Sequence, residues 1–222
     1  MVVVRMTDDG VSSWTVNTTA IGISLNGKYI AGAGDHFMFV NSIDSILDIN
    51  KIPYTKQTSF RNASFVKWHP NRTNLFVTAC SQMVGVYQYT QGGRLRTVNS
   101  GRLHPRNIND IDWSYTEDNT FMTCADGEPI AIWDCRTSIQ RPCKSLQAIT
   151  GADQAKFAPS MNYIVSTVHG TDIRIWDDRY RTTPIASTVA HSGRITSLAW
   201  HPTNNTFVTS GTDGYIKVSY IE

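Results

Sequence analysis

The segment WHPTNNTFVTSGTDG, residues 200–214, carries the pattern that decides the fold. Trp200 ends a stretch of alternating apolar and polar residues, and the proline that follows stops a strand because it has no N–H to donate to a ladder. The Asn and Thr residues after it favour a turn, FVTS is typical of a second strand, and Thr-Asp-Gly-Tyr at 212–215 indicates a tight hairpin. The segment therefore predicts a meander of short antiparallel strands.

Four further segments align with this one. They are WHPNRTNLFVTAC from Trp68, WSYTEDNTFMTCA from Trp113, FAPSMNYIVSTVHG from Phe157 and, more faintly, ISLNGKYIAGAG from Ile23. The first residues of these segments are anchors that recur every 43 to 45 residues, and Trp-Asp pairs follow two of them, in IWDCR and IWDDR. A period of about 40–45 residues with Trp-Asp endings is the signature of WD repeats, in which each repeat forms a four-stranded propeller blade.

The sequence thus predicts an all-β fold, a WD40 β-propeller of about five blades within a single domain, 1–222. The repeats run approximately over 1–45, 46–90, 91–136, 137–180 and 181–222. We expect inner strands near 20–25, 64–68, 109–113, 153–157 and 195–200. Third strands are expected at 37–41, 84–89, 130–133, 172–176 and 215–219. The run most open to a helical interpretation, 42–51, is assigned to a loop and an outer strand.

The β-prone segment Val2–Arg5 bears on whether the propeller closes. In a closed ring of five blades it would pair with the third strand near 215–219. We expect instead an incomplete, open propeller, because closing a ring at five would widen the angle between blades. Open blade faces are apolar, and such faces aggregate or recruit a partner. The chain alone is therefore predicted to be poorly soluble and to recover when further blades are supplied.

Composition excludes several classes of function. The 222 residues are 41% apolar and 17% charged, with a net charge of +2, which argues against capture of nucleic acid by the whole molecule. No apolar run approaches the ~18 residues that span a bilayer, and the N-terminal residues do not resemble a signal peptide. The cysteines at 80, 124, 135 and 143 have no metal-binding spacing, so free thiols and no metal or other cofactor are expected.

Two sets of residues have the types of a Ser-His-Asp triad but recur at fixed offsets. The third repeat carries His104, Thr123, Asp126 and Trp133, and the last carries His191, Thr209 or Ser210, and Asp213. A catalytic triad is needed in one place only, whereas WD repeats use such residues as a buried hydrogen-bond network. Because buried polar groups must satisfy one another, both sets are predicted to be structural.

The remaining Trp-Asp positions are given the same interpretation. Trp176 is expected to pack between blades, and Asp134 and Asp177 occupy the same repeat position, which marks them as structural. Paired carboxylates such as Asp110 and Asp112 also suit glycoside hydrolysis, but nothing in the sequence marks either as an acid catalyst. We therefore expect no enzyme activity and no small-molecule substrate.

Arginines are the candidate partner contacts. The segment 92–106 holds four of them and no acidic residue, namely Arg94, Arg96, Arg102 and Arg106. A solvated loop is one interpretation, and a contact for an acidic partner or an anionic membrane is the other. RNA binding would require interleaved aromatic residues, which are absent here. Arg136 and Arg179 close the two Trp-Asp-x-Arg motifs and are further candidates.

The order of the irregular repeats resembles one family. The succession VVVRM, TAIGISLNGKYIAGAGDHFMFVNSID, INDIDWSYTEDNTFMTCADGEPIAIWDCR and ITGADQAKFAPSMNYIVSTVHGTDIRIWDDR, followed by AHSGRITSLAWHP, is similar to the N-terminal propeller of the WD repeat-containing protein 59 family. The segment GADQAKF, 151–157, resembles the atypical fourth repeat of that family, which also lacks the usual histidine. The family propeller has more blades than the five found here.

This resemblance implies a non-enzymatic scaffold subunit of a GATOR/SEA-type complex. Such a complex relays amino-acid sufficiency to TOR complex 1 as a positive regulator, at the cytoplasmic surface of the lysosomal or vacuolar membrane. The implied partners are other protein subunits of the complex, with no nucleic acid. The alternative is a substrate receptor of a cullin-type ubiquitin ligase, which would dock on its adaptor through the two Trp-Asp-x-Arg motifs.

Overall fold

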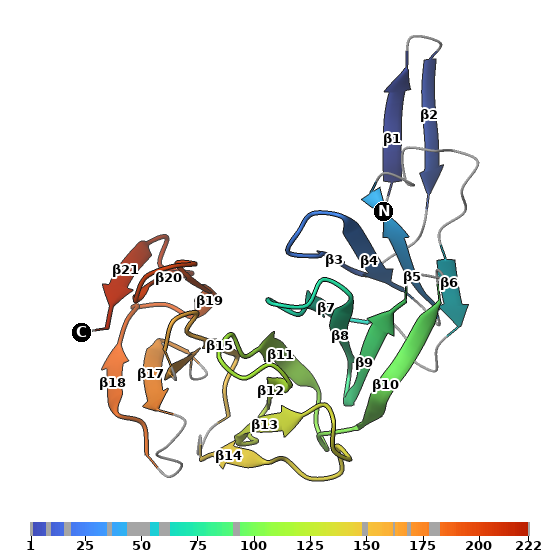
Figure 1. Cartoon of the computed structure of the whole chain (residues 1–222). Helices are drawn as coiled ribbons and strands as arrows, with labels where there is room; N and C mark the ends of the chain where they lie inside the picture. Colours follow the sequence, from blue (N-terminus) through green and yellow to red (C-terminus); the bar gives the residue numbers. More distant parts are fainter. Residues whose placement is uncertain are drawn as a thin grey trace. The chain divides into compact units, whose positions relative to one another are not determined.

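Antiparallel pairing between consecutive strands builds the sheets of this protein. The structure, a computed structural model, describes residues 2–7, 10–15, 19–34, 37–43, 54–57, 63–90, 94–147, 151–161, 163–167, 170–177 and 183–221. These residues contain twenty-one β-strands in six sheets, five of which are propeller blades (Figure 1). The sixth sheet is a hairpin of β1 (Val2–Thr7) and β2 (Gly10–Thr15).

The chain divides into two compact units, Met1–Gly101 and Arg102–Glu222. Unit 1 holds the hairpin and two blades. Blade 1 is β3 (Ala20–Ile23), β4 (Tyr29–Ala33), β5 (Phe37–Ser42) and β6 (Tyr54–Gln57). Blade 2 is β7 (Phe65–Trp68), β8 (Leu75–Cys80), β9 (Met83–Tyr89) and β10 (Leu95–Arg102), whose last residue lies at the boundary.

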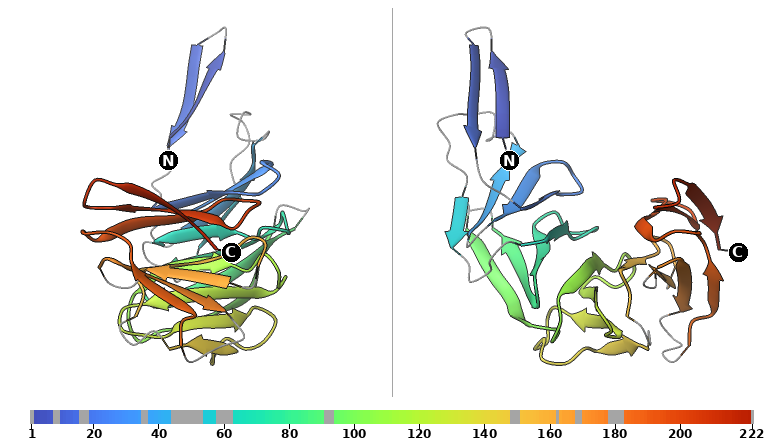
Figure 2. Two further views of the ribbon diagram at one scale, coloured as in Figure 1. Left: turned by 90° about the vertical axis from the view of Figure 1, so that its left-hand side faces the viewer. Right: turned by 180° about the vertical axis from the view of Figure 1, so that it is seen from behind.

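Unit 2 holds three blades that follow one another (Figure 2). Blade 3 is β11 (Ile108–Trp113), β12 (Thr120–Ala125), β13 (Ile130–Asp134) and β14 (Lys144–Leu146). Blade 4 is β15 (Gln154–Phe157), β16 (Tyr163–Thr167), β17 (Asp172–Asp177) and β18 (Ala186–Val189). Blade 5 is β19 (Ile195–Trp200), β20 (Thr206–Gly211) and β21 (Ile216–Tyr220).

The predicted fold class is confirmed. Every expected inner and third strand is present within one or two residues of its expected bounds, and the described part of 60–222 contains no helix. In blade 1 the outer strand is Tyr54–Gln57. The run 42–51, which is most open to a helical interpretation, lies outside the described part of the chain from residue 44 on.

The sheets also agree with an incomplete propeller. Val2–Thr7 pairs with Gly10–Thr15 in the hairpin. Blade 5 has three strands, and β21 has no second neighbour among the described strands. Among the described strands, the N-terminal strand therefore belongs to the hairpin sheet.

In blades 2, 3 and 5 the side chain that follows the anchor accepts hydrogen bonds from the backbone of the next turn. Nδ1 of His69 accepts hydrogen bonds from the backbone N–H groups of Asn71 and Arg72, both at 3.0 Å. Nδ1 of His201 accepts from the N–H of Thr203 at 3.2 Å, and Oγ of Ser114 accepts from that of Glu117 at 3.0 Å. Either histidine or serine can occupy this position, because the turn requires only a side-chain atom that accepts a hydrogen bond from its N–H groups.

The apolar core lies between blades. In unit 2 one cluster joins Ile130 and Ile132 of blade 3 to Ala155, Phe157 and Trp176 of blade 4. A second cluster joins Ile173 of blade 4 to Leu198 and Phe207 of blade 5. In both cases the third strand of one blade is covered by the inner strand of the next, so stability depends on stacking neighbours.

Candidate functional site

Blade 3 contains a buried hydrogen-bond network centred on one hydroxyl. Oγ1 of Thr123 accepts a hydrogen bond from Nε1 of Trp133 at 2.8 Å and lies 2.7 Å from Nε2 of His104. All three residues are buried, and burial lowers the pKa of His104 to about 4. The imidazole of His104 is therefore neutral at physiological pH. In this form it can stay buried and hydrogen-bonded, and it joins the segment before β11 to β12 and β13.

Asp126 does not join this network as the sequence predicted. Among the described contacts its carboxylate accepts from Nδ2 of Asn109 at 2.6 Å, and its backbone bridges to Gly151. Asp126 is exposed, and Asn109 also donates to the carbonyl of Ala152 at 3.2 Å. The turn carboxylate therefore bonds Asn109 of its own blade instead of the buried histidine.

Blade 5 joins the histidine to the turn carboxylate. Nδ1 of His191 lies 3.0 Å from each carboxylate oxygen of Asp213, and Nε2 lies 2.9 Å from Oγ1 of Thr209. Burial opposes ionisation of Asp213, but hydrogen bonds from His191 and from the N–H groups of Tyr215 and Ser192 outweigh it and lower the pKa of this carboxyl to about 2.

This chain of hydroxyl, imidazole and carboxylate has the connectivity of a catalytic triad. A nucleophile must reach a substrate carbonyl, however, and the hydroxyl of Thr209 belongs to a residue that is 1% exposed. In the shared register of the two blades, Thr123 pairs with Ala131 and Thr209 with Lys217, so the two threonines are equivalent. Their burial argues for a structural role at both positions.

The two Trp-Asp-x-Arg motifs are placed differently. In blade 3 the guanidinium of Arg136 donates to the carboxylate of Asp134, from Nε to Oδ1 at 3.0 Å and from Nη2 to Oδ2 at 2.6 Å. Hydrogen bonds from Arg136 lower the pKa of Asp134, although the Arg136 side chain remains 68% exposed. In blade 4 Trp176 and Asp177 are buried, and Arg179 lies outside the described residues.

The arginine-rich segment contains a strand, which corrects the expectation of a loop over 92–106. Leu95–Arg102 is β10, the outer strand of blade 2, and Arg94 and Arg96 are exposed at its beginning. Arg102 and Arg106 are also exposed; Nε of Arg102 donates to the carbonyl of His104 at 3.4 Å. Outer strands of blades face solvent, so exposed charge here costs no desolvation.

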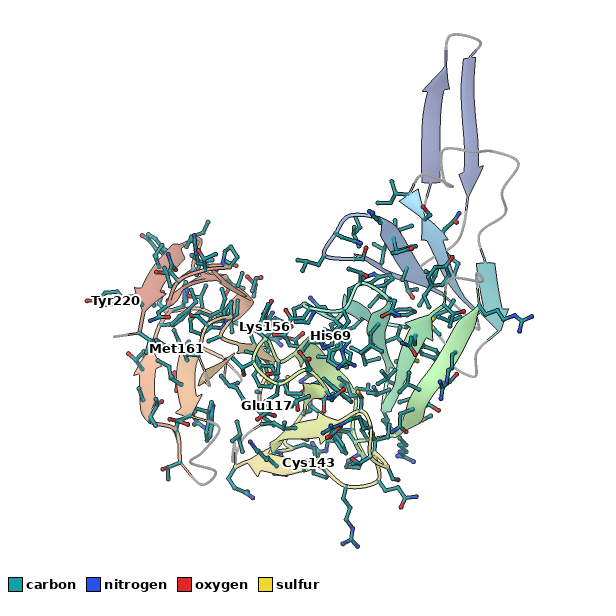
Figure 3. All side chains as sticks on the ribbon, in the orientation of Figure 1. His69, Glu117, Cys143, Lys156, Met161 and Tyr220 are labelled. Carbon is teal, nitrogen blue, oxygen red and sulfur yellow. The ribbon has the colours of Figure 1, made fainter. Side chains whose placement is uncertain are left out.

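The sequence did not reveal the polar links between inner strands. Lys156 of blade 4, labelled in Figure 3, forms an ion pair with Asp110 of blade 3, and Asp112 accepts from the N–H of Phe157 at 3.1 Å. Burial works against the charged ammonium, but Asp110 and Asp112 raise the pKa of Lys156. The two carboxylates once considered for glycoside hydrolysis are thus held by the neighbouring blade.

Gln154 repeats this link between blades 4 and 5. Its Oε1 accepts from the N–H of Leu198 at 2.9 Å, and its Nε2 donates to the carbonyl of Thr196 at 2.8 Å. Asp110 and Gln154 both stand three residues before an anchor. A polar residue at this offset in consecutive repeats is the signal that could have identified the links.

A polar pocket of about 530 Å³ lies where the inner strands of unit 2 begin. Its lining comes from all three blades and comprises Asn109, Asp126, Asp153, Gln154, Arg194, Ile195, Thr196 and Thr212. Nη2 of Arg194 lies 3.3 Å from Oδ2 of Asp153, and Arg194 is 61% exposed. The pocket offers donors and acceptors to a polar partner segment.

Within the described residues, no group of three His, Cys, Asp or Glu residues is placed to hold a metal ion, and no helix is long and apolar enough to cross a membrane.

Comparisons with known proteins agree with the repeat pattern. The WD domain, G-beta repeat, matches residues 182–218. The chain is 31% identical to GATOR2 complex protein WDR59 of Gallus gallus over 86% of its own length, and 28% identical to that of Homo sapiens over 83%. The resemblance to the WD repeat-containing protein 59 family is confirmed.

The similarity extends to fungi but covers only part of each relative. Maintenance of telomere capping protein 5 of Saccharomyces cerevisiae is 23% identical over 89% of this chain. The chain spans about a fifth of the length of these relatives, namely 20%, 19% and 17%.

Proposed function

We propose that this chain is a non-enzymatic WD-repeat scaffold subunit of a GATOR/SEA-type complex. The observation that carries the proposal is its similarity, over 83–86% of its length, to relatives named GATOR2 complex protein. The buried His104 and His191 networks support the absence of catalysis, since they hold strands together and keep their hydroxyls from solvent. Through the complex, the chain acts as a positive regulator of TOR complex 1 signalling in response to amino acids.

The location follows from the same proposal. The chain works in the cytoplasm, at the surface of the lysosomal or vacuolar membrane, and reaches the membrane through its protein partners. The exposed Arg94 and Arg96 on the outer strand of blade 2 suit an acidic surface of another subunit.

Affinity purification of the tagged chain from cells that express it tests the proposal. Co-purification of GATOR2-type propeller and solenoid subunits is expected. A cullin and its propeller adaptor in their place would support the alternative, a ubiquitin-ligase substrate receptor. In that case Arg136→Ala would abolish adaptor binding, because this guanidinium is the exposed group of the Trp133–Arg136 motif.

A cellular assay tests the signalling role. Deleting the gene should weaken phosphorylation of TOR complex 1 substrates after amino acids are restored, and fluorescent tagging should show the chain on lysosomes or vacuoles. Unchanged substrate phosphorylation in deletion cells would refute the signalling role even if the complex forms.

A further inference from the structure

A second pocket, of about 670 Å³, lies between blades 1 and 2 of unit 1. Tyr29 at the start of β4 lines it from blade 1, and the turn Asn71–Asn74 and the segment Gln88–Thr90 line it from blade 2. Its described lining therefore combines two tyrosines, one arginine and a set of amides and hydroxyls, and contains no carboxylate.

The two tyrosines are held in place by aromatic contacts. The ring of Tyr29 stacks on that of Trp68 with centroids 6.4 Å apart, and the ring of Tyr89 lies at 57° to that of Tyr29 with centroids 5.2 Å apart. Nε1 of Trp68 donates to the carbonyl of Gly22 at 2.9 Å, which anchors this series of rings to blade 1. Tyr29 and Tyr89 are only partly buried, so they present a preformed aromatic wall to a ligand.

The turn that carries the arginine is held through its backbone. Nδ1 of His69, labelled in Figure 3, accepts from the N–H groups of Asn71 and Arg72, both at 3.0 Å. The N–H of Tyr89 donates to the carbonyl of Asn74 at 2.8 Å. These bonds do not use the guanidinium of Arg72, so that group is not required to close the turn.

The pocket lies where blade 2 departs from the Trp-Asp-x-Arg motif. Strand register places Gln88–Thr90 of blade 2 where blade 3 has Asp134–Arg136. In blade 3 the guanidinium of Arg136 bonds the carboxylate of Asp134 at 2.6 Å. Blade 2 has neither residue at these positions, so no carboxylate of this motif competes with a ligand for Arg72.

The charge around the pocket selects the kind of ligand. Residues 49–109, which include all of blade 2, contain nine Lys and Arg residues and no Asp or Glu. Lys28 directly precedes Tyr29, and the carbonyl of Arg94 accepts from the N–H and Oγ1 of Thr90 at 2.9 and 3.0 Å. Both cations are exposed and flank the lining, and a region of this charge attracts an anionic partner.

We propose that this pocket binds an acidic peptide segment of a partner protein, in which an apolar side chain contacts Tyr29 and Tyr89 and a neighbouring Asp or Glu pairs with Arg72. The amides of Asn74 and Gln88 each offer a donor and an acceptor, which match the N–H and C=O of a peptide backbone. Single-stranded nucleic acid suits the pocket less well, because it requires successive stacking platforms along a basic groove. The site depends on unit 1 alone, whether or not the chain joins a GATOR/SEA-type complex.

Selection from a phage-displayed library of random peptides tests the proposal with the full chain. Panning should enrich sequences in which Asp or Glu stands beside an aromatic or aliphatic residue. One enriched peptide, synthesised with a fluorescent label, is then titrated by anisotropy. Arg72→Glu should weaken its binding about tenfold or more, because repulsion replaces a charge-assisted hydrogen bond. Arg96→Glu makes the same change of charge on β10, outside the lining, and as the matched control should weaken binding less than about threefold.

Two further variants test the aromatic wall. Tyr89→Cys introduces the residue that blade 3 has at this position, and Tyr29→Leu introduces the residue that blade 2 has, since the carbonyls of Tyr29 and Leu75 accept equivalent hydrogen bonds. Each should weaken peptide binding about tenfold. Melting curves verify that the variants fold, and Arg72→Glu should melt near the temperature of the parent chain, because the bonds from His69 to the turn use backbone groups.

Three results would overturn the proposal. Failure to enrich acidic sequences would show that the pocket does not select an acidic peptide. Equal losses for Arg72→Glu and Arg96→Glu would show that the peptide responds to the charge of blade 2 and not to the pocket. Tighter binding of a labelled oligouridine than of the peptide, lost in Arg72→Glu, would assign the site to nucleic acid.

Discussion

Replacing Thr123 by valine should destabilise the protein strongly although the two side chains have the same shape. Thr123 is 0% exposed, and its hydroxyl is the shared partner of Trp133 and His104. The substitution leaves two buried polar groups without that partner, each at a cost of about 1–3 kcal/mol. The added methyl group recovers less than about 1 kcal/mol. With each cost near the middle of its range, the expected loss in the free energy of unfolding is about 2–4 kcal/mol.

The register supplies two matched positions at which the same substitution should cost less. Thr209 in blade 5 is 1% exposed and bonds His191, but Ser219 stands where blade 3 has Trp133, so one partner is lost instead of two. Thr78 in blade 2 is 0% exposed and its hydroxyl has no hydrogen-bond partner among the described residues. Thr78→Val should therefore be neutral or stabilising.

Calorimetric melting of the three variants measures the series. At about 2–4 °C per kcal/mol for a chain of this size, Thr123→Val should lower the melting temperature by about 5–15 °C and Thr209→Val by roughly half as much. Thr123→Ser, which keeps the hydroxyl, controls for the methyl group and should cost about 1 kcal/mol. Equal losses for Thr123→Val and Thr78→Val would refute the reasoning, because the partners would then contribute nothing.

Three further outcomes are expected. Burial lowers the pKa of His104 to about 4 from an unfolded value of 6.5, so the unfolded state binds the extra proton between these values, and stability should fall by about 2 kcal/mol from pH 7 to pH 5. Acid melting curves of the protein and of His104→Gln measure this, and parallel curves would contradict it. Gly211→Ala should lower the melting temperature, because a Cβ at 211 would lie 2.7 Å from Nδ1 of His191 and 2.8 Å from Oδ1 of Asp213. Gly214→Ala meets no atom within 4 Å, and its φ of +80° should limit the cost to about 1–2 kcal/mol of backbone strain. Arg94→Glu with Arg96→Glu should leave the melting temperature unchanged and weaken co-purification of partner subunits; full retention of partners would exclude β10 as their contact.

The strands were predictable because repeats reinforce one another. A single strand such as Gln154–Phe157 is weak evidence, but its anchor falls 44 residues after Trp113 and 43 before Trp200, which fixes its position. The hydrophobic alternation then assigns each face. The same reasoning failed for β10, since its exposed polar residues resemble a loop, and only its pairing with β9 makes it a strand.

Contacts between blades were less accessible to sequence reasoning. The partners Asp110 and Lys156 are 46 residues apart, and nothing local indicates that the two side chains meet. Asp126 illustrates the opposite problem, because it has the correct offset for the histidine network. Asn109, a competing donor, binds its carboxylate instead. Whether a turn carboxylate joins the histidine network therefore depends on which donors lie near it in three dimensions.

The outer strand of each of blades 1 to 4 comes from the start of the next sequence repeat, and this offset matters for the design of truncated chains. Deleting residues 91–136 as one repeat would strip β10 from blade 2 and leave β14 without the rest of blade 3. Truncation series designed on sequence repeats would thus damage two sheets per step, and a lost interaction would be assigned to the wrong segment. Boundaries between an outer strand and the next inner strand, such as between Leu146 and Gln154, leave each sheet whole.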